Sequence, residues 1–199
     1  MKKKSFWKRC NRGFIVSMAL LVAVLGYVTV TQVMLAGQKK EIRAITDQVQ
    51  TVLVDAAKVP NADAQAMVAD TTKAAAYRDA AKKKLAGLFV KDAAYLDAGA
   101  ESVVDAIKDA AAEDRTITSM KKDANPYEYT IRIDEDTAAV SESITYCVTG
   151  TWSDYDDDTD SVTLKERTGR LSIVWDASFV KEDGAWKLYR INGVSLFAW

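Results

Sequence analysis

The chain has 199 residues, with 27 basic and 28 acidic side chains, two cysteines and no histidine. The lack of histidine removes the commonest general base near neutral pH and the commonest zinc ligand. Six of the 27 bases lie in residues 1–12, which hold no acid, so the other 21 bases and 28 acids give residues 13–199 a net charge of −7. This acidic balance argues against nucleic acid as a partner, because neutralising phosphates requires a basic surface.

Residues 13–38 contain no charged side chain and predict a transmembrane helix. The 23 residues from Phe14 to Ala36 span ~35 Å as a helix, enough for a hydrocarbon core of ~30 Å. A cleaved signal peptide has a shorter apolar core, and a bacterial lipoprotein would need cysteine where Gln38 stands. We therefore expect an uncleaved anchor, with cleavage near Gly37 as the alternative.

The basic head, residues 1–12, sets the expected orientation. Cytoplasmic flanks carry an excess of Lys and Arg, so the N-terminus should be cytoplasmic and the rest extracytoplasmic, as in a single-pass protein of the inner or plasma membrane. The head could also contact anionic membrane lipid. The simpler interpretation is that it only fixes topology.

Residues 39–60 predict a helical stalk. Apolar residues recur there at alternating spacings of three and four, at Ile42, Ile45, Val49 and Val52. Such a seam is typical of a coiled coil, which would make these residues partner-binding positions in a homo-oligomer. Alternatively the helix packs on its own domain, which Leu53 and Val54 favour because they widen the apolar face. Pro60 should end the helix.

The remainder, residues 61–199, should form one extracytoplasmic domain. Helical spacing covers residues 63–90, a short piece at 93–96, and 101–112. Alternation of apolar and polar residues then predicts strands over 127–133, 140–152, 171–179 and 185–191. Helices followed by strands joined through hairpins predict an α+β fold, with helices on one face of a curved antiparallel sheet.

One strand carries a parity conflict. Val162 and Leu164 are even-numbered, whereas the apolar residues from Leu171 to Phe179 are odd-numbered. Both sets can face the core only if the parity slips by one between them. We expect a β-bulge near Gly169, or a break into two strands.

The order of elements, with the closing Asp183-Gly184-Ala185-Trp186-Lys187-Leu188, resembles the nuclear transport factor 2-like superfamily over roughly Ala64–Ile191. The resemblance implies a cone-like α+β domain. Two membrane-anchored branches share this layout: assembly subunits of type IV secretion and conjugation machines, and membrane proteins associated with actinobacterial lipid import. It thus implies a bacterial envelope protein that works through contacts with other envelope proteins. The superfamily also includes ketosteroid isomerase and related dehydratases, so the fold does not exclude catalysis.

An acidic segment from Asp154 to Asp160 is the most conspicuous local feature. Its carboxylates are candidate divalent-cation ligands, at Asp154, Asp156, Asp158 and Asp160. The spacing begins like an EF-hand loop, but Thr159 or Ser161 stands where glycine is needed, and Lys165 or Arg167 where a bidentate Glu is needed. A solvated hairpin tip is the favoured interpretation.

Catalysis would require a base inside the cone. Glu142 or Asp176 could serve, paired with Tyr146 or Tyr129, because burial raises the pKa of a carboxyl group into a useful range. No catalytic signature is present, and the sequence predicts no cofactor.

The C-terminal tail is apolar. Leu196, Phe197 and Trp199 should dock either on the domain's own helices or on a partner, since undocked termini fray.

The sequence as a whole favours a non-catalytic, membrane-anchored scaffold or assembly subunit. A small-molecule or lipid-binding module that uses the cone cavity is the alternative, followed by an enzyme of the hydratase or isomerase type.

Overall fold

The computed structural model describes residues 12–156 and 160–198, without the side chains of residues 12 and 124–127. Within these residues four helices precede four strands, which confirms the predicted α+β class. The helices are α1 (Arg12–Ala57), α2 (Asn61–Ala69), α3 (Thr71–Leu85) and α4 (Ala93–Ala111). The strands are β1 (Arg115–Asp134), β2 (Thr137–Asp156), β3 (Ser161–Glu182) and β4 (Ala185–Ala198).

The chain divides into two compact units, Met1–Glu41 and Ile42–Trp199. In the first unit, the large apolar side chains of α1 between Phe14 and Met34 are exposed. The stretch Gly13–Ala57 is long and apolar enough to cross a membrane, by length and composition. It is compatible with the predicted single-pass anchor.

The second unit begins within α1 and includes the predicted stalk. Ile42, Val49 and Leu53 are completely buried, and they belong to the same core as the sheet. The compact unit thus begins at Ile42, whereas the sequence placed the start of the domain after a stalk, at residue 61. The apolar seam packs on its own domain because Leu53 and its neighbours broaden it into a face that a sheet can cover.

Local backbone chemistry sets the limits of α3 and α4. Asp70 has an extended backbone (φ −129°) and separates α2 from α3, where the sequence predicted one helix. Its carboxylate caps α3 by accepting a hydrogen bond from the amide of Thr72 at 2.8 Å. Asp92 caps α4 through the amide of Ala94 at 2.9 Å. α4 continues through Gly99, so the predicted break there is wrong. A Cβ at this position would overlap the ring of Phe89, so the glycine serves packing.

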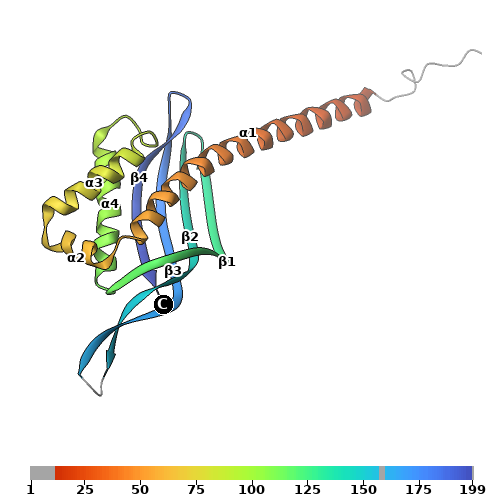
Figure 1. Cartoon of the computed structure of the whole chain (residues 1–199). Helices are drawn as coiled ribbons and strands as arrows, with labels where there is room; N and C mark the ends of the chain where they lie inside the picture. Colours follow the sequence, from red (N-terminus) through yellow and green to blue (C-terminus); the bar gives the residue numbers. More distant parts are fainter. Residues whose placement is uncertain (1–11, 157–159, 199) are drawn as a thin grey trace, which may run out of the picture. The chain divides into compact units, whose positions relative to one another are not determined.

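The four strands form one antiparallel sheet in the order β1-β2-β3-β4. The strands curve, and α4 lies against β4 (Figure 1). β1 begins at Arg115, well before the predicted start at Tyr127, and its pairing with β2 shifts register between Lys122 and Tyr127. The early half escaped prediction because only Ile117 and Met120 in it are apolar, too few to show a period of two.

Even-numbered residues of β2 and odd-numbered residues of β3 face the helices. The buried side chains of this set are Ala138, Val140, Glu142, Ile144, Tyr146, Val148, Trp152, Leu171, Ile173, Trp175, Ala177 and Phe179. No register shift interrupts the pairing of β2 with β3, so the predicted bulge or break near Gly169 is wrong. Val162 and Leu164 keep their parity and lie on the opposite face, with 63% and 69% of their surface exposed.

The apolar tail is the end of β4. Leu196 is buried in the domain's own core. The guanidinium of Arg115 donates from Nη2 to the carbonyl of Leu196 at 3.1 Å. Burial lowers the pKa of Arg115 to about 10, so it stays charged at neutral pH. Phe197 is 42% exposed, and Trp199 lies outside the described residues.

The burial of α1 in the domain predicts a specific stability effect. Leu53→Ala should lower the free energy of unfolding by about 2–5 kcal/mol, because it leaves a cavity in the core. The matched control Val68→Ala, on exposed α2 surface, should change it by less than about 0.5 kcal/mol. Urea unfolding of the full-length protein in detergent, followed by tryptophan fluorescence, measures both. An unfolding midpoint that rises with protein concentration would contradict the intramolecular packing.

Candidate functional site

The polar side chains deepest in the domain surround Glu142 of β2, which is 1% exposed. Glutamate is almost never fully buried unless it is paired. Here Arg43 of α1 places Nη1 3.1 Å from Oε1, and the indole N–H of Trp175 donates to Oε2 at 2.9 Å. Both carboxylate oxygens are therefore engaged by the protein itself.

Gln50 of α1 extends this network toward a tyrosine. Its amide Nε2 donates to the hydroxyl of Tyr146 at 3.0 Å, and its Oε1 accepts from the same Trp175 N–H at 3.1 Å. We call Arg43, Gln50, Glu142, Tyr146 and Trp175 the polar cluster. Arg43 and Gln50 come from α1, where they lie two helical turns apart, and the other three members come from the sheet. The cluster therefore joins the helical layer to the sheet.

Arg43 lies where the cluster approaches solvent, with 29% of its side chain exposed. It also pairs with Asp47 at 3.0 Å and lies over the ring of Tyr129, 4.2 Å from the centroid. The planar guanidinium can make a carboxylate contact and a ring contact at the same time, which an ammonium group does less well. Arg43 thus covers Glu142 on its solvent side.

Burial dominates the electrostatics of the cluster. It raises the pKa of Glu142, and the opposing effect of Arg43 is smaller. Burial also raises the pKa of Tyr146 and of Tyr129, so both phenols are neutral at physiological pH. Of the two candidate carboxyl groups, Glu142 is the buried one, and Tyr129 is its neighbour in the register of β1 and β2. Asp176, the other candidate, is exposed on the opposite face of the sheet.

The cluster has little room for a substrate. A general base must reach the proton that it removes, within about 2.6–3.2 Å or through one water. The side chain of Glu142 has no exposed surface, and α1 lies over it. Sequence reasoning named Glu142 as a candidate buried base. Nothing in the local sequence indicated that its partners would be Arg43 and Gln50, about a hundred residues earlier in the chain.

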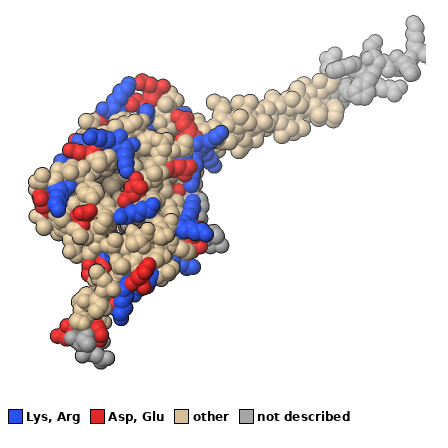
Figure 2. Space-filling view, viewed as in Figure 1, with Lys and Arg blue, Asp and Glu red and all other residues tan. Residues whose placement is uncertain are grey.

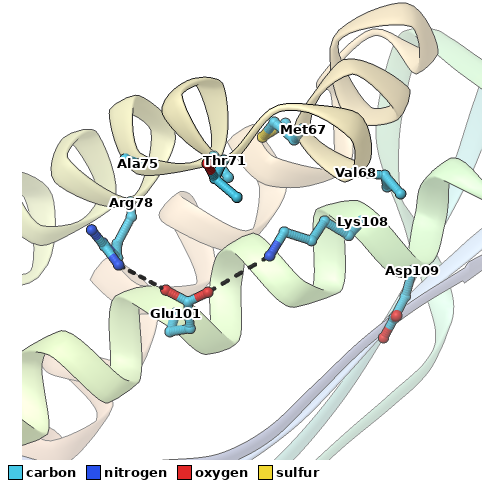
Figure 3. Close-up of a pocket in the computed structure, with 9 residues that line it drawn as sticks. Met67, Val68, Thr71, Ala75, Arg78, Glu101, Lys108 and Asp109 are labelled. Carbon is cyan, nitrogen blue, oxygen red and sulfur yellow. Dashed lines mark hydrogen bonds and ion pairs between the residues drawn. The ribbon is translucent and has the colours of Figure 1, made fainter.

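A separate groove lies between α2, α3 and α4 (Figure 3). It encloses about 550 Å³, with Met67 and Val68 on one wall and a carboxylate, Glu101, on the other. Glu101 bridges two cations, with Arg78 at 3.4 Å and Lys108 at 3.6 Å. Val68 is 64% exposed. The groove is open and of mixed polarity, and its residues form no motif that a single sequence could reveal.

The predicted partner-binding positions separate into two groups. Ile42, Ile45, Val49 and Val52 are at most 9% exposed, and Leu196 is 6% exposed. These five side chains are covered by their own domain, which is the alternative arrangement that the sequence left open for the helix and the tail. Phe197 keeps a substantial exposed surface, and Trp199 lies outside the described residues.

The acidic segment forms the end of the β2–β3 hairpin, where Figure 2 shows acidic side chains together. Asp154 pairs with Lys165 at 2.5 Å, and Asp160 accepts from the hydroxyl of Tyr155. Asp158 lies outside the described residues. Within residues 12–156 and 160–198, no group of three or more acidic or cysteine side chains is arranged to hold a metal ion.

The raised pKa of Glu142 predicts a pH dependence of stability. The folded pKa lies above the ordinary value of 4.5, so the folded state binds this proton more tightly and loses stability as pH rises from 4.5 through the folded pKa. Glu142→Gln removes this titration. Its free energy of unfolding relative to wild type should therefore increase across that window and stay constant below it, as measured by urea unfolding at a series of pH values.

Glu128→Gln, on the exposed surface of β1, controls for the loss of a carboxylate elsewhere on the sheet. Stability curves of the wild-type and Glu142→Gln proteins that run parallel at every pH would contradict the burial of the carboxyl group.

No protein-family model matches the chain, and no curated protein matches it. Among solved structures, the chain is similar to a provisionally assigned dehydratase of the NTF2-like (nuclear transport factor 2-like) family from Streptomyces avermitilis. The two share 16% sequence identity with a TM-score of 0.29, over 69% of this chain and 99% of that chain. At this level of similarity the neighbour carries no information on what the present chain does.

Proposed function

We propose that the chain is a single-pass membrane protein of a bacterial envelope, and that its domain is a non-catalytic scaffold or assembly subunit that acts through protein contacts. The N-terminus is cytoplasmic and the domain is extracytoplasmic. The observation that carries the proposal is the closed polar cluster: the site where a cone-like domain could hold a catalytic base is filled by side chains of its own helix α1.

The membrane part of the proposal is supported by α1. Between Phe14 and Met34 its large apolar side chains are exposed, and Figure 2 shows this stretch without charged side chains. Such a surface is costly in water and favourable in lipid, where a helix also satisfies its own backbone hydrogen bonds. The six bases before it and the mixed charges after it support the orientation.

The non-catalytic part is supported by how Glu142 is used. Its charge is matched by Arg43 and its second oxygen by Trp175, so the carboxylate holds α1 on the sheet. Removing one partner from a buried ion pair leaves an uncompensated charge, which gives such a pair a strong structural role. A base with both oxygens engaged and no exposed surface is poorly placed for proton abstraction.

A binding module for a small apolar molecule is the second candidate function. A pocket of about 150 Å³ lies between α1, α3 and α4, lined mainly by apolar side chains that include Val52, Val103 and Ile107. Typical ligand sites enclose about 300–1,000 Å³. The pocket would therefore take only the end of an acyl chain, which places lipid binding behind protein binding.

A chemical crosslinking experiment on native membranes tests the scaffold. The full-length protein, crosslinked and then purified in mild detergent, should run as a complex larger than a monomer and contain other envelope proteins. A Glu142→Gln protein that still folds should keep the composition of that complex and the cellular function, because the carboxyl group serves the fold and not a reaction. A monomer without crosslinked proteins would contradict the proposal, as would loss of function in a Glu142→Gln protein that still folds and assembles.

A further inference from the structure

The most polar side chain of the apolar stretch from Phe14 to Ala36 is the carboxamide of Gln32. The midpoint of this stretch is residue 25, so Gln32 lies ~10 Å beyond it in a helix that rises ~1.5 Å per residue. Half of a hydrocarbon core of ~30 Å is ~15 Å. With the N-terminus cytoplasmic, Gln32 therefore lies inside the hydrocarbon layer, on its outer side.

The direction of helical side chains keeps this carboxamide in the lipid. In an α-helix the Cα–Cβ bond tilts toward the N-terminus, and long side chains continue in that direction. The N-terminal end of α1 is the cytoplasmic end, so the side chain of Gln32 leans toward the middle of the bilayer and away from the nearer headgroups. A long side chain can bring its polar end to the interface only when it leans toward that interface, and Gln32 leans the other way.

Helix α1 satisfies its own threonines but not this glutamine. The hydroxyl of Thr29 donates to the carbonyl of Leu25 at 2.8 Å, and the hydroxyl of Thr31 donates to the carbonyl of Tyr27 at 2.9 Å. Among residues 12–156 and 160–198, no group donates to or accepts from the carboxamide of Gln32. Lipid tails hold neither donors nor acceptors, so its N–H groups and its carbonyl oxygen can be satisfied only by another polypeptide.

Gln32 belongs to one continuous face of α1. Alternating spacings of four and three residues connect Leu21, Leu25, Val28, Gln32 and Leu35, which we call the Gln32 face. This alternation is the one by which two helices pack along a left-handed seam, both in water and in membranes. The side chains of Leu21, Leu25 and Val28 are exposed, so no part of the described chain covers the face.

We propose that two copies of the chain pair through the Gln32 face, and that their Gln32 carboxamides hydrogen-bond to each other within the membrane. The partner is a second copy because a carboxamide both donates and accepts, which makes it complementary to itself. All copies insert in the same orientation, so a parallel pair with a twofold axis brings identical residues to the same depth. The inference rests on the proposed function, because it requires α1 to cross a bilayer in one orientation.

A polar residue in an apolar seam also gives the pair its register. In coiled coils, one such residue fixes the alignment and the number of helices, because every other alignment leaves it unpaired. A helix of a different protein satisfies Gln32 only if it carries a polar residue at the same depth, whereas a second copy always does.

A second face of α1 offers the competing arrangement. It carries the small residues Ala19, Ala23 and Gly26, which permit close approach of two helices. At 3.6 residues per turn, Gln32 lies on the other side of the helix from these residues. Pairing through the small residues would therefore leave both carboxamides in lipid, which favours the Gln32 face.

Cysteine crosslinking in native membranes tests which face pairs. The full-length protein with Cys10→Ser and Cys147→Ser receives one new cysteine, either Val28→Cys on the Gln32 face or Val30→Cys, about 160° around the helix from Gln32. After mild oxidation, Val28→Cys should give a disulfide-linked dimer of the chain, and Val30→Cys should not. Equal dimer from both positions, dimer from Val30→Cys alone, or dimer from neither would overturn the proposal.

Substitution of Gln32 tests the hydrogen bond. Labelled full-length protein is diluted with lipid in phospholipid vesicles, and energy transfer between copies gives the dissociation constant of the dimer. Gln32→Leu should raise this constant at least about threefold, because it removes the carboxamide and keeps the face apolar. The matched control Gln38→Leu, at the end of the uncharged stretch, should leave it unchanged. An unchanged or lower constant for Gln32→Leu, or an equal rise for Gln38→Leu, would contradict the assigned contact.

The same membranes separate this inference from the proposed function. A protein that resists alkaline carbonate extraction and crosslinks to other envelope proteins, but forms no dimer through Val28→Cys, would remove the inference and leave the scaffold standing. A disulfide from Val28→Cys to a different envelope protein would likewise overturn the pairing of two copies. Release of the chain by carbonate would remove both the inference and the membrane anchor on which it rests.

Discussion

The ion pair between Arg43 and Glu142 connects helix α1 to strand β2. It joins the helix that carries the apolar stretch to the centre of the sheet, and Trp175 and Gln50 complete its hydrogen bonds. A buried pair of this kind adds little net stability over apolar packing, but it penalises every arrangement that leaves the charges unpaired. The pair therefore fixes the register of α1 on the sheet more than it strengthens the domain.

Apolar packing around the cluster supplies the stability. Ile42, Val49 and Leu53 cover the sheet on one side of the helix, and Trp175 and Phe179 lie beneath them in the same core. An α+β domain whose interior is occupied in this way has its remaining interaction surfaces on the outside. The open groove between α2, α3 and α4 is one such surface among the described residues.

Sequence reasoning recovered the α+β class and the odd-numbered core positions of β3 from Leu171 to Phe179, because both depend on short-range periodicity. It also named Glu142 as a candidate buried base. It could not find Arg43 and Gln50 as partners, since their contacts with the sheet join residues far apart in the chain. The continuity of α4 through Gly99 was also missed. Glycine stands there because the ring of Phe89 leaves no room for a Cβ, and this contact is not visible in the local sequence. Val162 and Leu164 do not face the core and are exposed to solvent. Periodicity alone cannot tell an exposed apolar residue from a buried one.

The central claim is that residues 42–57 of α1 are part of the domain and close its interior. The most direct measurement compares two soluble fragments, residues 42–199 and residues 61–199, by two-dimensional NMR of the backbone amides. The longer fragment should give a dispersed spectrum and cooperative thermal unfolding, whereas the shorter one, with the core and the charge of Glu142 uncovered, should give neither. A dispersed spectrum and cooperative unfolding of residues 61–199 alone would contradict the account.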